Sequence, residues 1–167
     1  MNPGQTAPEP FSPAWKPGVI ANLVFLTRGD EVLLIHKKTG FGAGKINGPG
    51  GKLEPGETAL ESAVREVREE LLITPRSLRE MGELHFDFVD GLKLHCTVFH
   101  GNEFEGVPRE TREARPEWFR IDEIPYDRMW ADDRHWLPQM LAGRRFKAWF
   151  RFDREEMLSR EVVFLDR

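Results

Sequence analysis

The sequence of 167 residues has only one cysteine, Cys96. A single cysteine forms no intramolecular disulfide and builds no zinc-thiolate cluster, so a hydrophobic core must hold the fold together. A chain of this length is long enough to bury such a core within one domain. The low cysteine content also suits a reducing compartment, and we expect a cytoplasmic protein.

Long apolar runs are missing as well. No stretch approaches the roughly 20 apolar residues that cross a bilayer, and the N-terminus lacks the basic and apolar segments of a secretory signal. The net charge is −4, which argues against a general affinity for a nucleic-acid backbone but permits a local basic pocket for a small anion. We therefore expect a small-molecule partner, no nucleic-acid polymer, no membrane association, and a monomer.

Proline is concentrated at the N-terminus, where five of the twelve prolines fall within Pro3 to Pro17. This segment shows neither helical nor strand periodicity, which predicts a disordered or loosely docked tail over residues 1–17 and a single domain over 18–167. Apolar patterns in the rest of the chain predict strands at 19–26, 32–35, 84–88, 92–99, 118–121, 146–152 and 162–165, and a helix at 132–141. The fold class is therefore α/β (α+β), with a mixed β-sheet packed between helices.

The clearest helix begins at Thr58, where Thr58 and Glu61 have the spacing of a capping box. Leu60, Ala63, Val64, Val67 and Leu71 then recur with helical spacing, which predicts a buried apolar face.

Charged residues occupy a second face of the same helix. Glu66, Glu69 and Glu70 are three and four residues apart and should form one exposed ridge of carboxylates. Carboxylate oxygens are the ligands that Mg²⁺ and Mn²⁺ prefer. Arg65 has Glu61 and Glu69 four residues away on either side, and we expect it to pair with both and to orient the ridge.

A glycine-rich loop precedes the helix and contains Gly50, Gly51 and Lys52. Glycine lets a backbone approach a metal ion or a phosphate closely. Taken alone, residues 65–70 are more typical of a solvated, salt-bridged helix face. The positions of Gly51 and Glu57 upstream favour a functional site instead.

The stretch from Gly51 to Ile73 resembles the Nudix box. That family pattern is glycine, five residues, glutamate, seven residues, Arg-Glu, an aliphatic, any residue, Glu-Glu, any residue, glycine and an aliphatic. Every fixed position matches except Leu72, which stands where the family has glycine. Leucine there costs about 1 kcal/mol if the left-handed helix end is kept, and the alternative is a helix that continues toward Thr74.

The resemblance implies a Nudix fold and a metal-dependent hydrolase of a nucleotide diphosphate linkage. Its catalytic residues would be Glu57, Arg65, Glu66, Glu69 and Glu70. The metal, Mg²⁺ or else Mn²⁺, would be held by Gly50, Glu66, Glu69, Glu70 and Glu113. The family pattern leaves three candidates for the general base, namely Glu66, Glu69 and Glu113.

Stretches outside the box resemble the MutT-type branch of this family that acts on oxidised purine nucleoside triphosphates. They include Gly40 to Lys45, Phe86 to Val89 and Met129 to Asp133. The resemblance implies hydrolysis to a nucleoside monophosphate and pyrophosphate, with substrate contacts from Asn22, Lys37, Phe41, Asn47, Gly51, Lys52, Phe86, Trp130, Asp132 and Asp133. Asn47 and the two aspartates would bind the purine edge, and the three aromatic side chains would line its pocket.

Asn22 departs from this branch, which has threonine at that point. Each pocket residue also has a structural interpretation, since Trp130 and Phe86 are typical of a core and Asp132 and Asp133 of a helix N-cap. Two other functions stay open. One is a Nudix hydrolase of another substrate, such as a dinucleoside polyphosphate or a nucleotide sugar, and the other is a non-catalytic Nudix-fold binding module.

Overall fold

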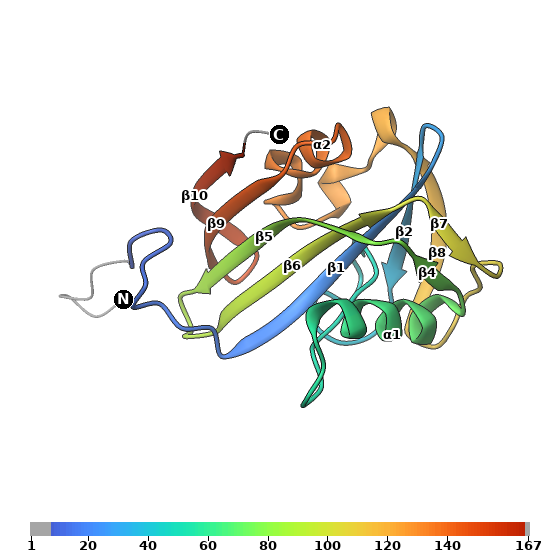
Figure 1. The fold of residues 1–167 in the computed structure, drawn as a ribbon. Helices are drawn as coiled ribbons and strands as arrows, with labels where there is room; N and C mark the ends of the chain where they lie inside the picture. The colour runs from blue at the N-terminus through green and yellow to red at the C-terminus, as the bar shows by residue number, and fades with distance from the viewer. Residues whose placement is uncertain (1–7, 166–167) are drawn as a thin grey trace.

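The computed structural model describes residues 8–165, which form one large sheet, one small sheet and two α-helices (Figure 1). The large sheet has the strand order β10-β9-β5-β6-β1-β2-β3, with β8 also paired to β2. Its strands are β1 (Val19–Arg28), β2 (Glu31–Lys37), β3 (Ile46–Asn47), β5 (Arg79–Phe88), β6 (Lys93–Gly101), β8 (Ala114–Arg120), β9 (Phe146–Asp153) and β10 (Glu156–Phe164). The small sheet pairs β4 (Thr74–Arg76) with β7 (Glu103–Glu105).

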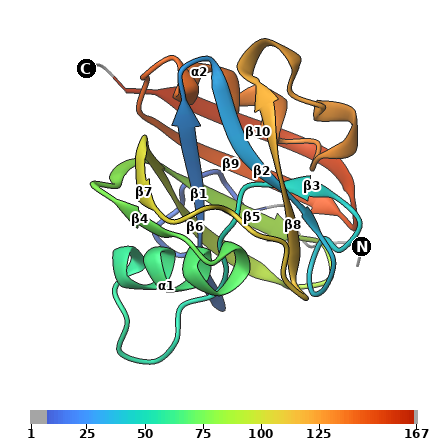
Figure 2. The same ribbon diagram turned by 90° about the vertical axis from the view of Figure 1, so that its right-hand side faces the viewer.

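The large sheet is mixed. β1 runs parallel to β6, and β5 runs parallel to β9, while the other pairs are antiparallel. Alternating side chains of β1 face two different cores: Phe25 packs with residues of α2 (Leu137–Leu141), and Val24 packs with residues of α1 (Ala59–Leu71). The two helices lie on opposite sides of the sheet in Figures 1 and 2. The predicted mixed sheet packed between helices is confirmed.

Helix α1 has the predicted capping box, with Thr58 and Glu61 exchanging hydrogen bonds of 3.1 and 3.2 Å. Ala63, Val67 and Leu71 are buried as expected. The prediction for Leu60 was wrong, because its side chain stays 46% exposed. Leu60 lies on the side of α1 that carries Glu61, Val64 and Arg68, away from the buried Ala63, and Val64 is only partly buried.

Leu72 ends the helix in the left-handed conformation, with φ of 59° and ψ of 33°. Its backbone N–H donates to the carbonyl oxygen of Arg68 and satisfies the helix end. The chain thus keeps the family's backbone geometry without glycine and accepts a cost of about 1 kcal/mol.

The predicted second helix at residues 132–141 is shorter than expected. A 3₁₀ turn, η3 (Asp133–His135), comes first, and α2 begins only at Leu137. Pro138 explains the break, because its ring lacks an N–H and clashes with the carbonyl four residues earlier in a continuous helix. Two further 3₁₀ turns, η1 (Ile121–Glu123) and η2 (Tyr126–Arg128), lead from β8 toward this segment.

Part of the N-terminal segment docks on the sheet. Residues 1–7 lie outside the described residues, but Trp15 is buried and its indole N–H donates to the Asp87 carboxylate over 3.0 Å. Trp15 and Phe11 also contact Trp149 edge to face. The sequence left open a disordered or a loosely docked segment, and over residues 8–17 the structure has the docked form. Phe11 and Trp15 are four positions apart, and two aromatic residues are too few to give a periodic pattern that predicts this docking.

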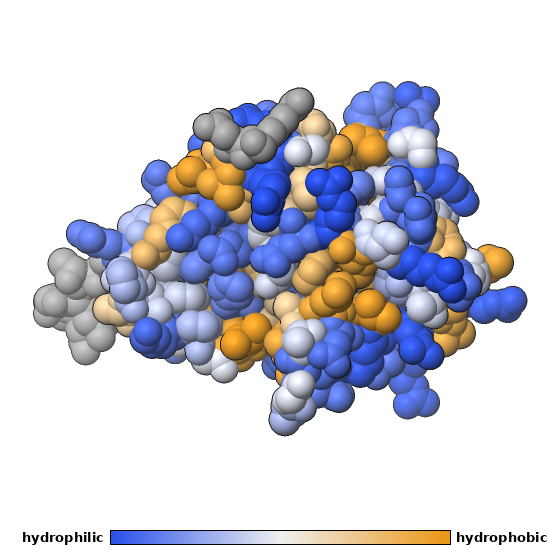
Figure 3. Space-filling model, viewed as in Figure 1, coloured by the Kyte–Doolittle hydropathy of each residue, from blue (hydrophilic) through white to orange (hydrophobic). Residues whose placement is uncertain are grey.

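On the face seen in Figure 3, hydrophilic residues predominate and apolar residues form several small patches, one of them beside α1. Within residues 8–165, no helix is long and apolar enough to cross a membrane.

Trp15→Ala should lower the free energy of unfolding by about 2 kcal/mol or more, because it removes a buried indole and leaves Asp87 without that donor. Trp15→Phe should lower it by about 1 kcal/mol, since the ring packing is largely kept. Urea denaturation of both variants measures the difference. Wild-type stability in Trp15→Ala would show that the segment does not dock in solution.

Candidate active site

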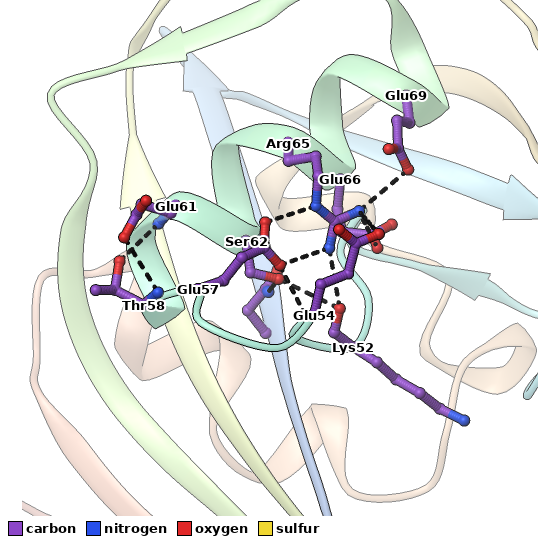
Figure 4. A network of polar contacts seen from close by, with 10 residues as sticks. Lys52, Glu54, Glu57, Thr58, Glu61, Ser62, Arg65, Glu66 and Glu69 are labelled. Carbon is purple, nitrogen blue, oxygen red and sulfur yellow. Dashed lines mark hydrogen bonds and ion pairs between the residues drawn. The ribbon is translucent and has the colours of Figure 1, made fainter.

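The guanidinium of Arg65 is the centre of a polar network at the start of α1 (Figure 4). It donates to both carboxylate oxygens of Glu57, over 2.6 and 2.8 Å. It also donates to the Lys52 carbonyl oxygen over 3.1 Å, to Glu66 over 2.9 Å and to Glu69 over 3.2 Å. One side chain therefore joins the glycine-rich loop, the helix and two of the predicted carboxylates.

This network fixes the ionisation of its members. The hydrogen bonds that Arg65 donates lower the pKa of Glu57 to about 2, and the same bonds, accepted by the Glu57 carboxylate, raise the pKa of Arg65. The expected pairing of Arg65 with Glu61 was wrong, because the Glu61 carboxylate is used in the capping box at Thr58. Glu57 takes its place, since the loop folds back along the helix.

The carboxylates do not form one exposed ridge. Glu70 is buried, Glu66 is half-buried and Glu69 is exposed. The oxygens that come together belong to Glu66, Glu70 and Glu113, which have ligand atoms within 4.8 Å of one another. Glu69 turns toward Arg65 instead. The predicted exposure of Glu70 was wrong because that side of the helix faces the sheet and the loop before β8.

Close packing of the glycine-rich loop brings its backbone to this cluster. A Cβ atom at Gly51 would lie 2.5–2.7 Å from the Glu66 carboxylate. A Cβ at Gly50, which has φ of 153°, would lie 2.1 Å from the Asn22 carbonyl oxygen. Larger residues have no room at either position, so both glycines are needed for the loop to reach Glu66 and β1.

Electrostatics make the cluster a suitable cation site. Burial raises the pKa of Glu70 to about 8, with a further contribution from the charge of Glu66, and nearby Lys37 opposes the shift. Burial also raises the pKa of Glu66. Within residues 8–165, Glu70 Oε2 has no hydrogen-bond partner. Three converging hard oxygen donors, one of them buried and unpaired, match the donor set of a divalent cation such as Mg²⁺.

A pocket begins beside this cluster and extends across β1 toward the turn before α2. The pocket contains the predicted residues Asn22, Lys37, Phe41, Asn47, Gly50, Gly51, Lys52, Phe86, Trp130, Asp132 and Asp133. Phe41 and Trp130 are stacked with ring centroids 5.1 Å apart, and Lys45 lies over the Trp130 ring at 5.2 Å. The pocket thus joins an aromatic wall to the carboxylate cluster through the glycine-rich loop.

Asp132 and Asp133 lie buried in this pocket. The Trp136 indole N–H donates to Asp132 Oδ2 over 2.9 Å. Among the described residues, Asp132 Oδ1 and Asp133 Oδ2 have no hydrogen-bond partner, and neither side chain caps a helix. Burial raises the pKa of Asp132 to about 6, and burial together with the Asp132 charge raises the pKa of Asp133 well above its ordinary value. Two adjacent buried carboxyl groups whose pKa values are both raised are expected to titrate as one coupled pair.

Two asparagines complete the polar groups of the pocket. Asn22 donates through Nδ2 to Ser62 Oγ over 2.9 Å, and its buried Oδ1 has no partner within residues 8–165. Asn47 accepts the Gly48 backbone N–H through Oδ1 over 2.9 Å. Each side chain thus has one end held by the protein.

Several pocket residues were not found from the sequence. They include Phe88, Cys96, Leu23, Ile35 and Gly48 in the lining, and Trp136 and Ser62 behind it. Alternation along β5 places Phe88 on the same face as Phe86, which was a usable signal. Cys96 lies beside Ala21 through the parallel pairing of β1 and β6, and no local pattern predicts that pairing.

Comparison with known proteins places this geometry in a family. A family model described as NUDIX domain matches residues 16–140. The chain belongs to the Nudix family. The fold agrees, since the crystal structure of a mutator MutT protein from Bacillus halodurans superposes with a TM-score of 0.76 at 28% identity, covering 86% of this chain and 97% of that one. The predicted Nudix fold is confirmed.

Two relatives are similar over most of the chain. The oxidized purine nucleoside triphosphate hydrolase of Danio rerio is 42% identical over 140 residues, covering 83% of this chain and 90% of the relative. The protein of the same description from Mus musculus is 40% identical over 146 residues, covering 86% and 94%.

Glu70→Gln should stabilise the metal-free protein at pH 8. In the folded state Glu70 keeps its proton up to about pH 8, whereas the unfolded chain releases it near the ordinary value of 4.5. Between pH 4.5 and pH 8 the unfolded chain therefore binds fewer protons at this group than the folded protein does. The free energy of unfolding then falls as the pH rises, and glutamine, which does not titrate, removes this loss of stability. We expect a gain of about 1 kcal/mol or more in the presence of EDTA.

The matched control is Glu69→Gln, which should change stability by no more than about 0.5 kcal/mol because Glu69 is exposed. Thermal unfolding at pH 5 and pH 8 makes the comparison. Equal stability of Glu70→Gln and wild type at pH 8 would contradict the conclusion that burial raises the pKa of Glu70.

Proposed function

We propose that the protein hydrolyses oxidised purine nucleoside triphosphates to the nucleoside monophosphate and pyrophosphate, with Mg²⁺ as the metal ion. The observation that supports this most strongly is the pair of buried, partly unpaired aspartates in an aromatic pocket that ends at a carboxylate cluster. The two relatives named above are described as oxidized purine nucleoside triphosphate hydrolases.

The carboxylate end of the pocket would receive the triphosphate. Glu66, Glu70 and Glu113 would hold the ion. Glu69 and the Gly50 carbonyl oxygen would be further ligands. Bound Mg²⁺ would neutralise phosphate charge and lower the pKa of an attacking water. Glu66, Glu69 and Glu113 remain the candidates to accept the proton of that water.

Arg65 and Glu57 would act as positioning residues. Their bidentate contact holds the loop against the helix, so that Gly51 and Glu66 keep a fixed distance. Lys37 borders both the pocket and the cluster and adds positive charge for the phosphates. The geometry of the phosphate end thus depends on charged hydrogen bonds within the protein and not on the substrate.

The aspartate end of the pocket would recognise the base. A protonated carboxyl donates one hydrogen bond, and its ionised neighbour accepts from N–H groups. A pair that shares a proton can donate to the carbonyl of 8-oxoguanine and accept from its N–H groups. Movement of the proton to the other aspartate would suit an oxidised adenine, whose edge has a different donor and acceptor pattern. Phe41, Phe86 and Trp130 would pack against the faces of the base, with Asn47 at its edge.

Asp132→Ala and Asp133→Ala test this assignment. Each should lower kcat/KM for 8-oxo-dGTP and 2-hydroxy-dATP by at least about 10-fold, because base polar groups are left unpaired in the pocket. Mg²⁺ binding should be unchanged, since the carboxylate cluster is intact. Asp127→Ala, which removes an acid whose side chain is 96% exposed, is the control and should retain wild-type kinetics. Wild-type kcat/KM in both pocket variants would refute the base assignment.

A further inference from the structure

A second group of metal-binding side chains lies on the other face of the large sheet. Glu83 and His85 are two residues apart on β5, and His95 on β6 is the direct cross-strand partner of His85. Side chains alternate along a strand, so these three point away from the pocket that Phe86 and Cys96 line. Their ligand atoms lie within 4.8 Å of one another.

The distances suit one ion. His95 Nε2 is 3.1 Å and His85 Nε2 is 3.4 Å from the two oxygens of the Glu83 carboxylate. A tetrahedral ion bound at about 2.0–2.1 Å has ligand atoms about 3.3 Å apart. We propose that Glu83, His85 and His95 form a binding site for a zinc-class divalent transition metal, separate from the carboxylate cluster of the active site.

Hydrogen bonding within the protein does not account for His85. Among residues 8–165, neither of its ring nitrogens has a hydrogen-bond partner, and both are buried. Trp15, Phe11 and Trp149 surround the ring, with centroids 5.4, 5.6 and 6.3 Å away. Burial lowers the pKa of His85, which keeps the ring in the neutral form that binds metals. The His85 Nε2 atom is therefore within ion-pair distance of the Glu83 carboxylate, at 3.4 Å, without a well-aligned hydrogen bond, an arrangement that suits a metal ligand.

The three side chains are accessible to an ion from solvent. The side chains of Glu83 and His95 are 35% and 23% exposed, so solvent reaches the group from that side and water can supply the fourth ligand. Lys147 Nζ forms an ion pair with Glu83 over 3.9 Å, which is too far for a hydrogen bond, and the same ammonium lies over the Phe11 ring at 4.6 Å.

Donor chemistry separates the two sites. Two imidazoles and one carboxylate select Zn²⁺, Co²⁺, Ni²⁺ or Cu²⁺ over Mg²⁺, whereas the cluster of Glu66, Glu70 and Glu113 offers oxygen alone. An ion bound by β5 and β6 would also link these two strands, which carry the pocket residues Phe86 and Cys96 on their other face. Because a ligand that binds only the folded state stabilises it, Zn²⁺ should raise the melting temperature.

Competition with a chromophoric chelator tests the site. The full chain is titrated with Zn²⁺ in the presence of excess Mg²⁺, which occupies the carboxylate cluster. Wild type should bind one tight equivalent of Zn²⁺, and His95→Gln should bind it at least about 10-fold more weakly. His36→Gln is the matched control, because His36 also contacts one carboxylate, that of Glu117 at 3.3 Å, but has no second imidazole beside it. This control should keep wild-type affinity.

Thermal unfolding gives a second readout. Zn²⁺ should raise the melting temperature of wild type and His36→Gln, and should leave that of His95→Gln unchanged. His95 is partly exposed, so its glutamine variant should fold even if a change at the more buried His85 prevents folding. Equal Zn²⁺ affinity in wild type and His95→Gln would overturn the proposal, as would loss of the tight equivalent in Glu70→Gln with retention in His95→Gln.

Discussion

The contact between Arg65 and Glu57 is the interaction on which the rest of the active site depends. Glu57 belongs to the glycine-rich loop and Arg65 to α1, so their two short hydrogen bonds close the loop onto the helix. The same guanidinium orients Glu66 and Glu69. Its planar fork of donors serves several acceptors at fixed angles, which the single ammonium of a lysine does not reproduce. Removal of the arginine would leave neighbouring carboxylates uncompensated, which makes this one side chain essential to the site.

Both ends of the pocket keep acidic groups in dry surroundings. Glu70 in the carboxylate cluster and the Asp132–Asp133 pair in the pocket are buried and have raised pKa values, and each side chain has an oxygen without a hydrogen-bond partner among residues 8–165. Such groups reduce the stability of the fold, since burial penalises a charge that finds no partner. The large sheet supplies the compensating core on both of its faces. Three of these destabilising groups thus lie where a cation and a base would bind, as expected of a functional site.

The features that the sequence predicted correctly depend on residues with short, fixed spacings along the chain. The capping box at Thr58, the loop glycines and the order of the Nudix box all follow from residues close together in the chain. The sequence did not predict contacts between segments far apart in the chain. The burial of Glu70, the docking of Trp15 and the pairing of His85 with His95 all depend on the tertiary arrangement of the sheet. Helical periodicity also predicted too much burial for Leu60, which lies toward the exposed side of α1, and too long a second helix, which Pro138 interrupts. Glu113 was placed near the metal by family resemblance alone, and its carboxylate does lie with Glu66 and Glu70.

The most direct test of the central claim is steady-state kinetics of the wild-type protein with Mg²⁺ on 8-oxo-dGTP, 2-hydroxy-dATP, dGTP and dATP, with the products identified. The proposed function predicts that the oxidised bases are favoured over the normal ones by at least about 10-fold in kcat/KM. The products should be the nucleoside monophosphate and pyrophosphate. Equal kcat/KM for oxidised and normal nucleotides, or release of inorganic phosphate in place of pyrophosphate, would contradict the account.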